Sequence, residues 1–283
     1  MFRLGYNTNG LAHHRPLDAL RLLAELGYEG VALTPDVGPL DPLAPDPNVV
    51  GDLRHWSDEL GMELTVETGA RFVLDARRKH FPTLLEDAAS DRDRRIDFLR
   101  RSVDLAADLG AGVCSLWSGA APTGLPGGLE PERAWDRLCA GLRPVLAHGS
   151  ERGVQIAFEP EPGMFVERPA GYLELLERLG AEGDTLGLCL DVGHLLCTGD
   201  LPVGRVIREL APRLVQVHLD DIRDGVHEHC MFGEGDLDLH ETLGALIEVG
   251  FDGLAAVELS RDSHRGAWAA AEAMARVRAA LAS

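Results

Sequence analysis

Short apolar runs recur along the chain, and polar or glycine-containing segments separate them. Each run is rich in β-branched or aromatic residues and too short for a helix, which predicts a β-strand. The segments between the runs carry apolar residues at helical spacing, as in DALRLLAELG (18–27) and DFLRRSVDLAADLG (97–110), and several end in the glycine that favours a helix C-terminus. The predicted strands are residues 2–7, 30–34, 63–68, 112–118, 154–159, 186–191, 214–219 and 254–259.

Eight apolar strands that alternate with helices in 283 residues predict a (β/α)8 TIM barrel. A doubly wound open sheet is the alternative, but no GxGxxG follows the first predicted strand. No Pro- or Ser-rich linker interrupts the pattern. We therefore expect a single domain over residues 1–283.

The composition of the chain disfavours several classes of binding partner and location. The chain carries 46 acidic and 27 basic residues, a net charge of −19, which disfavours nucleic acid because such binding depends on clustered Lys and Arg. No stretch is long and apolar enough for a membrane span, and the N-terminus MFRLGYNTNG lacks the features of a signal peptide, so we expect a cytoplasmic protein. The five cysteines are odd in number and contain no CxxC, which indicates reduced thiols.

A barrel brings its chemistry to the C-terminal ends of its strands. Glu159, Asp191, His218 and Glu258 end the fifth to eighth predicted strands in succession. A carboxylate at the end of an apolar strand is costly unless it is paired, protonated or bound to a cation. Three carboxylates and one imidazole on one half of the mouth predict a divalent metal, and mixed O and N ligation suits Mn²⁺, Mg²⁺, Co²⁺ or Zn²⁺. An ordinary polar rim with salt bridges is the alternative.

Five motifs follow one another along the chain: FEPEPG (158–163), LDVGH (190–194), VHLDD (217–221), HCMFGEGDLD (229–238) and VEL (257–259). Together they resemble the xylose-isomerase-like TIM-barrel superfamily of sugar isomerases, epimerases and endonuclease IV type nucleases. The resemblance covers nearly the whole chain and implies that Glu159, Asp191, His218 and Glu258 are metal ligands. It implies that His194 touches the substrate or the outer shell of the metal, and that the two glutamates exchange the substrate proton.

This chemistry predicts an isomerase or epimerase that acts on a sugar, a sugar phosphate or a keto-cyclitol. The metal binds the carbonyl and a neighbouring hydroxyl and stabilises the enediolate, while Glu159 or Glu258 removes the proton. Return of the proton by the same glutamate gives an isomerase, and return by the opposite one gives an epimerase. The expected partner is thus a small carbohydrate or cyclitol, with a homo-oligomer possible.

Other strand-end and loop residues have less specific predictions. Trp117 either walls the pocket or packs the barrel. Glu67 either binds a substrate hydroxyl or pairs with Arg71. In the HEH sequence after the seventh strand, His227 stands where nucleases of the superfamily carry an acid, which argues against a second metal. His229 is either a substrate contact or a solvated loop residue, and Glu161 belongs to a rigid loop.

A basic segment, RFVLDARRKH (71–80), stands out in this acidic chain and contains its only lysine, Lys79. It lies between the third strand and a helix that we expect to begin near Arg94. Arg71, Arg78 and Lys79 could capture an anionic group of the substrate. Alternatively, these cations pair with the acidic run that contains Glu86, Asp87, Asp91 and Asp93.

Three other functions remain as alternatives. A metal-dependent dehydratase of a keto-cyclitol or a dehydroshikimate-like acid would use the same enolate to expel a β-hydroxyl. An endonuclease IV type nuclease would need further metal ligands and a basic DNA face, but Glu67 and Trp117 occupy two strand ends where histidine ligands are expected. A non-catalytic binding protein would not need the complete set of four ligands.

Overall fold

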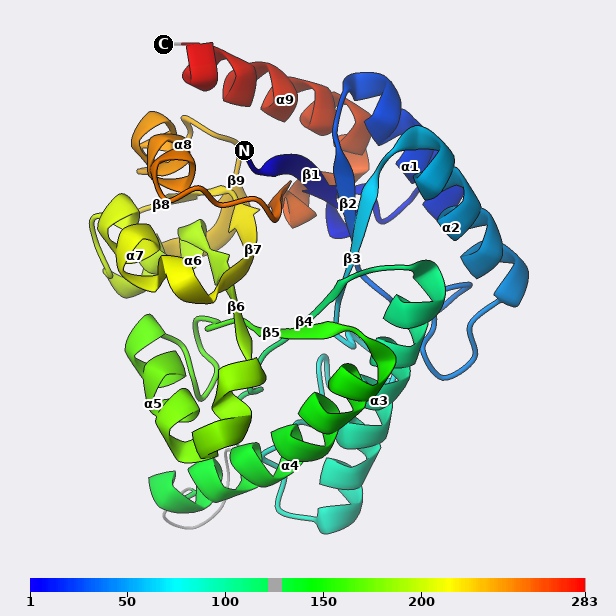
Figure 1. The fold of residues 1–283 in the computed structure, drawn as a ribbon, viewed down its shortest axis with the longest axis vertical. Coiled ribbons are helices and arrows are strands. Elements are labelled where there is room, and N and C mark those ends of the chain that lie inside the picture. The colour runs from blue at the N-terminus through cyan, green and yellow to red at the C-terminus, as the bar shows by residue number, and fades with distance from the viewer. Residues whose placement is uncertain (122–128, 283) are drawn as a thin grey trace. The chain divides into compact units, whose positions relative to one another are not determined.

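The computed structural model describes residues 1–121 and 129–282. Its parallel strands form a closed barrel in the order β1-β10-β7-β6-β5-β4-β3-β2 (Figure 1), so the predicted TIM barrel is confirmed. All eight predicted strands are present within one or two residues of their expected ends. They are β1 (Arg3–Asn7), β2 (Gly30–Leu33), β3 (Glu63–Glu67), β4 (Val113–Leu116), β5 (Gln155–Phe158), β6 (Gly187–Asp191), β7 (Leu214–Leu219) and β10 (Leu254–Val257).

The helices follow the strands as the apolar spacing predicts. Helices α1, α3, α4 and α6 end at a left-handed glycine, which is Gly27, Gly110, Gly153 or Gly199, and the glycine N–H donates to carbonyl groups of the last turn. One boundary was wrong, because the helix expected near Arg94 begins at Ala89. The helices are α1 (Pro16–Leu26), α2 (Pro47–Leu60), α3 (Ala89–Leu109), α4 (Pro131–Arg152), α5 (Pro169–Leu179), α6 (Val192–Thr198), α7 (Val203–Leu210), α8 (Leu239–Glu248) and α9 (Gly266–Ala282).

The chain divides into two compact units, so the expected single domain over 1–283 stays a prediction. The first unit comprises residues 1–34, 52–65 and 188–283. In it β10 pairs with β1 and β7, and β7 pairs with β6. Gly30 is required in β2, because a Cβ there would meet the Glu63 carbonyl oxygen at 2.8 Å. Buried side chains of this unit include Ala32, Leu254 and Ala256.

The second unit comprises residues 35–51 and 66–187. Its strands β4 and β5 pair in parallel, with Cys114 opposite Ile156 and Leu116 opposite Phe158. Helices α3 and α4 pack side by side in this unit (Figure 1). None of the helices in the described parts of the chain is long and apolar enough to cross a membrane.

An antiparallel hairpin after β7 was not predicted. Its strands are β8 (Asp221–Arg223) and β9 (Val226–Cys230), and Asp224 and Gly225 connect them. Both connecting residues have positive φ, 54° and 68°, which the tight turn of a two-residue hairpin requires and which Asp-Gly favours. The HEH sequence therefore lies on a strand, and the expectation of a loop there was wrong.

Candidate metal centre

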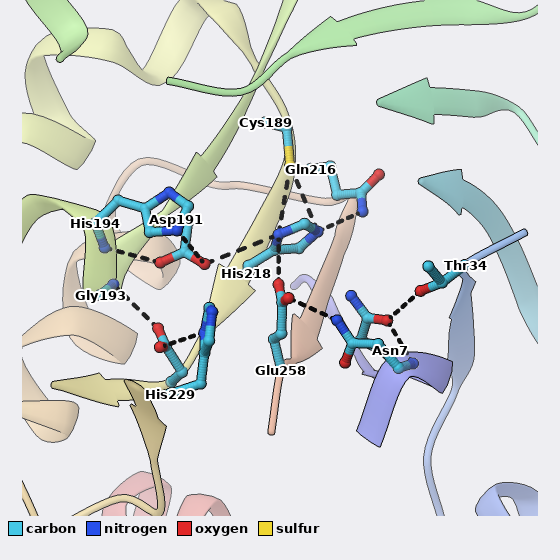
Figure 2. A network of polar contacts seen from close by, with 12 residues as sticks. Asn7, Thr34, Cys189, Asp191, Gly193, His194, Gln216, His218, His229 and Glu258 are labelled. Atoms are coloured by element: carbon cyan, nitrogen blue, oxygen red, sulfur yellow. Dashed lines mark hydrogen bonds and ion pairs between the residues drawn. The ribbon is translucent and has the colours of Figure 1, made fainter. Parts of the chain in front are cut away.

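Three of the four predicted ligands lie together at the strand ends of the first unit (Figure 2). Asp191 ends β6, His218 lies near the end of β7, and Glu258 directly follows β10. His218 Nδ1 lies 3.1 Å from Glu258 Oε2 and 4.0 Å from Asp191 Oδ2. The strand register explains this proximity, because Asp191 is opposite His218 and His218 is opposite Ala256, two residues before Glu258.

The two carboxylate oxygens of Asp191 have different roles. Oδ1 accepts a hydrogen bond from the His194 backbone N–H at 2.9 Å, which caps the N-terminus of α6. Oδ2 is buried and has no hydrogen-bond partner among the described residues. Burial, and next the negative charge of Asp220, raise the pKa of Asp191 well above its usual value. A cation beside Oδ2 would offset both effects.

Glu258 is held from two sides. Asn9 Nδ2 donates to Oε1 at 2.7 Å, and His218 Nδ1 lies 3.1 Å from Oε2. Burial alone would raise the pKa of Glu258, but His229 and His218 outweigh it and lower the pKa below its usual value. Asn9 is positioned in turn by Asn7, whose Oδ1 accepts from the Asn9 backbone N–H at 3.0 Å and from Thr34 Oγ1 at 2.8 Å.

A cluster of three histidines lies next to these ligands. His194 Nε2 is 3.0 Å from His227 Nε2, and His229 Nδ1 is 2.8 Å from Asp220 Oδ2. Burial, and next the charge of His229, lower the pKa of His227 to about 4. For His229, burial would lower the pKa, but the carboxylates of Asp220 and Glu258 outweigh it and raise the pKa well above its usual value. His229 is therefore partly buried beside carboxylates and is not a solvated loop residue.

The donor set fits a divalent cation. Ligand atoms of Asp191, Asp220 and His229 lie within 4.8 Å of one another, as do those of His194, His227 and His229. Such carboxylate and imidazole donors suit Zn²⁺, Mn²⁺ and similar ions. Because Asp191 Oδ2 is buried beside further carboxylates, a bound cation would relieve a repulsion that protein groups only partly balance.

The remaining predicted site residues belong to the second unit. Glu159 follows β5 and is buried, with its backbone N–H bonded to the Leu116 carbonyl at 2.8 Å. Glu67 ends β3 and is also buried. Trp117 is buried after β4, where its ring contacts the Arg95 guanidinium at 4.7 Å and the His80 ring at 5.3 Å. Trp117 is thus packed between polar side chains. The Glu161 backbone bonds Val166 and Met164, as expected for an ordered loop.

The basic segment has different ion-pair partners from those predicted. Arg71 Nη1 pairs with Asp36 Oδ2 at 2.9 Å, and Arg78 Nε pairs with Asp75 Oδ2 at 2.9 Å. For Arg71 and Arg78 the expected partners were wrong, because chain folding brings Asp36 to Arg71 and because Asp75 lies only three residues before Arg78. Lys79 is exposed. In the acidic run, Arg137 bonds Asp87 at 2.7 Å and Arg94 lies 3.5 Å from Asp91.

Sequence reasoning missed several polar residues that hold the ligands. Asn9 binds Glu258, Asp220 binds His229, and Gln216 Nε2 lies 2.9 Å from His218 Nε2. Two signals were available. Gln216 is the one amide inside the apolar run LVQVHL, and the first strand ends at Asn7 and is followed directly by Thr8 and Asn9, which brings two asparagines to the barrel mouth.

The fold and the donor set define a class, and comparison with known proteins agrees with it. The model of the family "Xylose isomerase-like TIM barrel" matches residues 20–280, so the chain belongs to this family. The structure of L-ribulose 3-epimerase superposes with a TM-score of 0.77 at 19% identity and covers 100% of this chain and 95% of that one. A crystal structure of "IOLI protein with a binding zinc atom" gives 0.76 at 18%, with 98% and 96% covered.

The matches to curated sequences cover a smaller part of the chain than the structural superpositions do. Over 145 residues the chain is 28% identical to the inosose dehydratase of Lacticaseibacillus casei, a match that covers 45% of this chain and 48% of that protein. The chain thus spans about half the length of the curated relatives it matches. The two structural similarities reported above, both below 25% identity, show the fold.

Proposed function

We propose that the protein is a metal-dependent isomerase or epimerase of a keto sugar, sugar phosphate or keto-cyclitol. One observation carries the proposal. Asp191, His218 and Glu258 converge at the ends of three neighbouring strands, and the Asp191 carboxylate is buried with one oxygen available. The sugar epimerases among the structural neighbours, such as L-ribulose 3-epimerase, are consistent with this class of reaction.

In this proposal Asp191, His218 and Glu258 bind the cation together with Glu159. The order of the closed barrel supports the fourth ligand, because β5, which precedes Glu159, is the neighbour of β6. The cation is Mn²⁺, Mg²⁺, Co²⁺ or Zn²⁺, and the neighbour that binds zinc supports a metal of this group. When bound, it polarises the substrate carbonyl and stabilises the negative charge that develops on oxygen.

The two glutamates move the proton. The pKa of Glu258 is lowered, so this side chain is ionised at neutral pH and can accept a proton from carbon. Asn9 donates a hydrogen bond to Oε1 of this carboxylate and so fixes the direction of the Glu258 side chain. Glu159 is the second proton-transfer group in the proposal. If one glutamate removes the proton and the other returns it, the product is the epimer.

Substrate hydroxyl groups are bound by the neighbouring polar side chains. His194 and His229 lie within the same cluster as the ligands, which supports their assignment as substrate contacts. Glu67, Trp117, Arg71 and Lys79 remain predicted contacts from the second unit. Arg71 already pairs with Asp36, which leaves Lys79 as the stronger candidate for an anionic group.

A metal-dependent dehydratase is the second candidate. The sequence matches to inosose dehydratases support it, and so does the histidine cluster, because expulsion of a β-hydroxyl needs an acid to protonate it. His229, with its raised pKa, could supply that proton through a bound water or directly. The elimination shares its first step, proton removal beside a carbonyl, with the isomerase reaction.

One experiment tests both candidates. The metal-loaded protein is incubated in D₂O with a panel of keto sugars, sugar phosphates and keto-cyclitols, and products are followed by proton NMR and mass spectrometry. Deuterium uptake at the carbon beside the carbonyl, with the hydroxyl groups retained, supports an isomerase or epimerase. Loss of one hydroxyl group and the neighbouring carbon-bound hydrogen, as water, supports the dehydratase. Unchanged substrates across the panel, with the metal bound, would count against both.

The base assignment is tested in the same assay with Glu258→Gln and Glu159→Gln. Each change keeps an oxygen donor but removes the base, so exchange should fall by about 10²-fold or more while metal content falls less. Wild-type exchange rates in both variants would rule out the two-glutamate mechanism.

A further inference from the structure

The layer of the barrel beneath the candidate ligands contains polar side chains. Along a strand, residues two apart face the same side, so Cys189 and Gln216 share the face of Asp191 and His218. Cys189 is opposite Gln216 in the register, one step below the pair formed by Asp191 and His218. Both Cys189 and Gln216 are completely buried. A barrel interior normally fills such positions with aliphatic side chains, so a thiol and an amide here need a reason.

Both side chains contact the His218 ring. Gln216 Nε2 lies 2.9 Å from His218 Nε2, and Cys189 Sγ lies 3.5 Å from the same nitrogen. The opposite nitrogen, Nδ1, faces Glu258 Oε2 at 3.1 Å and Asp191 Oδ2 at 4.0 Å. Figure 2 shows Gln216 at one end of the ring and the two carboxylates at the other. The ring therefore has one nitrogen for the candidate metal centre and one for Gln216.

A neutral imidazole carries its proton on one nitrogen only, and only the other nitrogen has a lone pair for a metal. The amide of Gln216 can face Nε2 with either end, because a half-turn about its last bond exchanges the oxygen and the nitrogen within the same volume. With Oε1 towards the ring, Gln216 accepts the Nε2–H bond. Nδ1 then carries the lone pair, on the side of Asp191 and Glu258.

We propose that Gln216 is a positioning residue that accepts a hydrogen bond from His218 Nε2–H and thereby fixes Nδ1 as the metal-binding nitrogen. Cys189 Sγ lies 3.5 Å from Nε2 and 3.9 Å from Nδ1, so this weak donor packs against the ring without a clear preference for one nitrogen. The inference rests on the proposed metal site. It adds to that site the residue that decides which nitrogen of His218 is the ligand and in which direction the ring points.

The tautomer itself is measured first, on the wild-type chain, and a variant is needed only to assign the signals. The protein is labelled with ¹⁵N-histidine and loaded with Zn²⁺, and the two-bond proton–nitrogen spectrum is recorded. His218→Asn identifies the signals by their loss. We expect protonated Nε2 and metal-bound Nδ1 for His218. Protonated Nδ1 with metal-bound Nε2 would overturn the proposal.

Zn²⁺ affinity, measured by competition with a chelating dye, tests the role of Gln216. Gln216→Met has a similar shape but no hydrogen-bonding group, and it should bind Zn²⁺ about 10-fold to 100-fold more weakly. Gln216→Glu can still accept from Nε2–H and should restore part of that loss. The matched control is Gln155→Met, the same change at the N-terminal end of β5, which should bind as the wild type does. Circular dichroism confirms that each variant is folded.

The outcomes separate this inference from the proposed reaction. Equal Zn²⁺ affinity of Gln216→Met and wild type would overturn the role of Gln216 and leave the isomerase proposal standing. A wild-type chain that binds Zn²⁺ with the expected tautomer but exchanges no substrate proton would overturn only the reaction. Failure of the wild type to bind Zn²⁺ would overturn both.

Discussion

Asn9 and Glu258 are separated by 249 residues in sequence, yet Asn9 Nδ2 donates a hydrogen bond to Glu258 Oε1 at 2.7 Å. The contact joins the turn after β1 to the end of β10, which is the neighbour of β1 in the barrel. Because the acceptor is an ionised carboxylate, the bond belongs to the stronger class of protein hydrogen bonds. It leaves Glu258 Oε2 to face His218.

Asn9→Ala should therefore impair proton transfer more than metal binding. The variant loses a charge-assisted bond worth roughly 1.5–3 kcal/mol, so the Glu258 side chain becomes free to turn. We expect the deuterium exchange rate to fall about 10-fold to 100-fold, the range that corresponds to this energy. Asn48→Ala on the exposed face of α2 is the matched control. Equal exchange rates for the two variants would mean that Asn9 does not hold the base.

His218→Ala should remove most of the bound metal. It deletes one of the proposed ligands, so the affinity for Zn²⁺ or Mn²⁺ should fall by more than the roughly 100-fold that an outer-shell partner contributes. Elemental analysis after dialysis measures the occupancy, with His13→Ala at an exposed position as the control. Full occupancy in His218→Ala would refute the ligand assignment.

The sequence predicted the barrel and the ligands for one physical reason. Eight strands covered on both faces must be apolar along their length, so a carboxylate or imidazole at a strand end is visible against that background. Glu159, Asp191, His218 and Glu258 could be named in this way. The contact of Asn9 with Glu258 could not, because the pairing of β1 with β10 determines it. The contact of Gln216 with His218, two residues apart on β7, depends on the orientation of the two side chains, which the sequence does not give.

The sequence did not predict hairpin β8–β9 or the ion pairs of the basic segment, for related reasons. Residues 226–230 are polar and half-exposed, so they lack the apolar run by which the barrel strands were found, and the Asp224–Gly225 turn signal was overlooked. Arg71 pairs with Asp36, which is 35 residues away. Only the folded loops bring these two side chains together. The acidic run that is near Arg71 in the sequence was therefore the wrong set of partners for it.

Asp221→Asn should destabilise the loop between β9 and α8. The buried Asp221 carboxylate accepts four backbone N–H bonds of 2.8–2.9 Å, from Ile222 and Leu237 to Oδ1 and from Gly233 and Gly235 to Oδ2. In Asp221→Asn an NH₂ group replaces one carboxylate oxygen. Two of the four backbone N–H donors would then face another donor group instead of an acceptor. We expect the free energy of unfolding to fall by roughly 3 kcal/mol.

Urea unfolding measures this loss, and hydrogen exchange should show faster exchange of the Gly233, Gly235 and Leu237 amides. The matched control is Asp236→Asn in the same loop, where the side chain is exposed and accepts one hydrogen bond within the described parts of the chain, from the Asp224 N–H at 2.9 Å. The idea that Asp221 organises the loop fails if the two substitutions have the same effect.

His80 should make the protein less stable as the pH falls from about 6.5 to about 4. Burial, and next the positive charge of Lys79, lower its pKa to about 4, although a bond to the Gly69 carbonyl opposes this. In the unfolded chain the pKa is near 6.5. Above that value the ring is neutral in both states; below it only the unfolded chain binds a proton, which favours unfolding by up to roughly 3 kcal/mol at pH 4.

Urea titrations with a chelator present should show this dependence of stability on pH in the wild type and a reduced slope in His80→Asn. Asn is chosen because it tolerates the positive φ of 69° found at this position. His13→Asn, at an exposed position, should keep the wild-type slope. An unchanged slope in His80→Asn would show that burial of this ring does not govern the acid sensitivity.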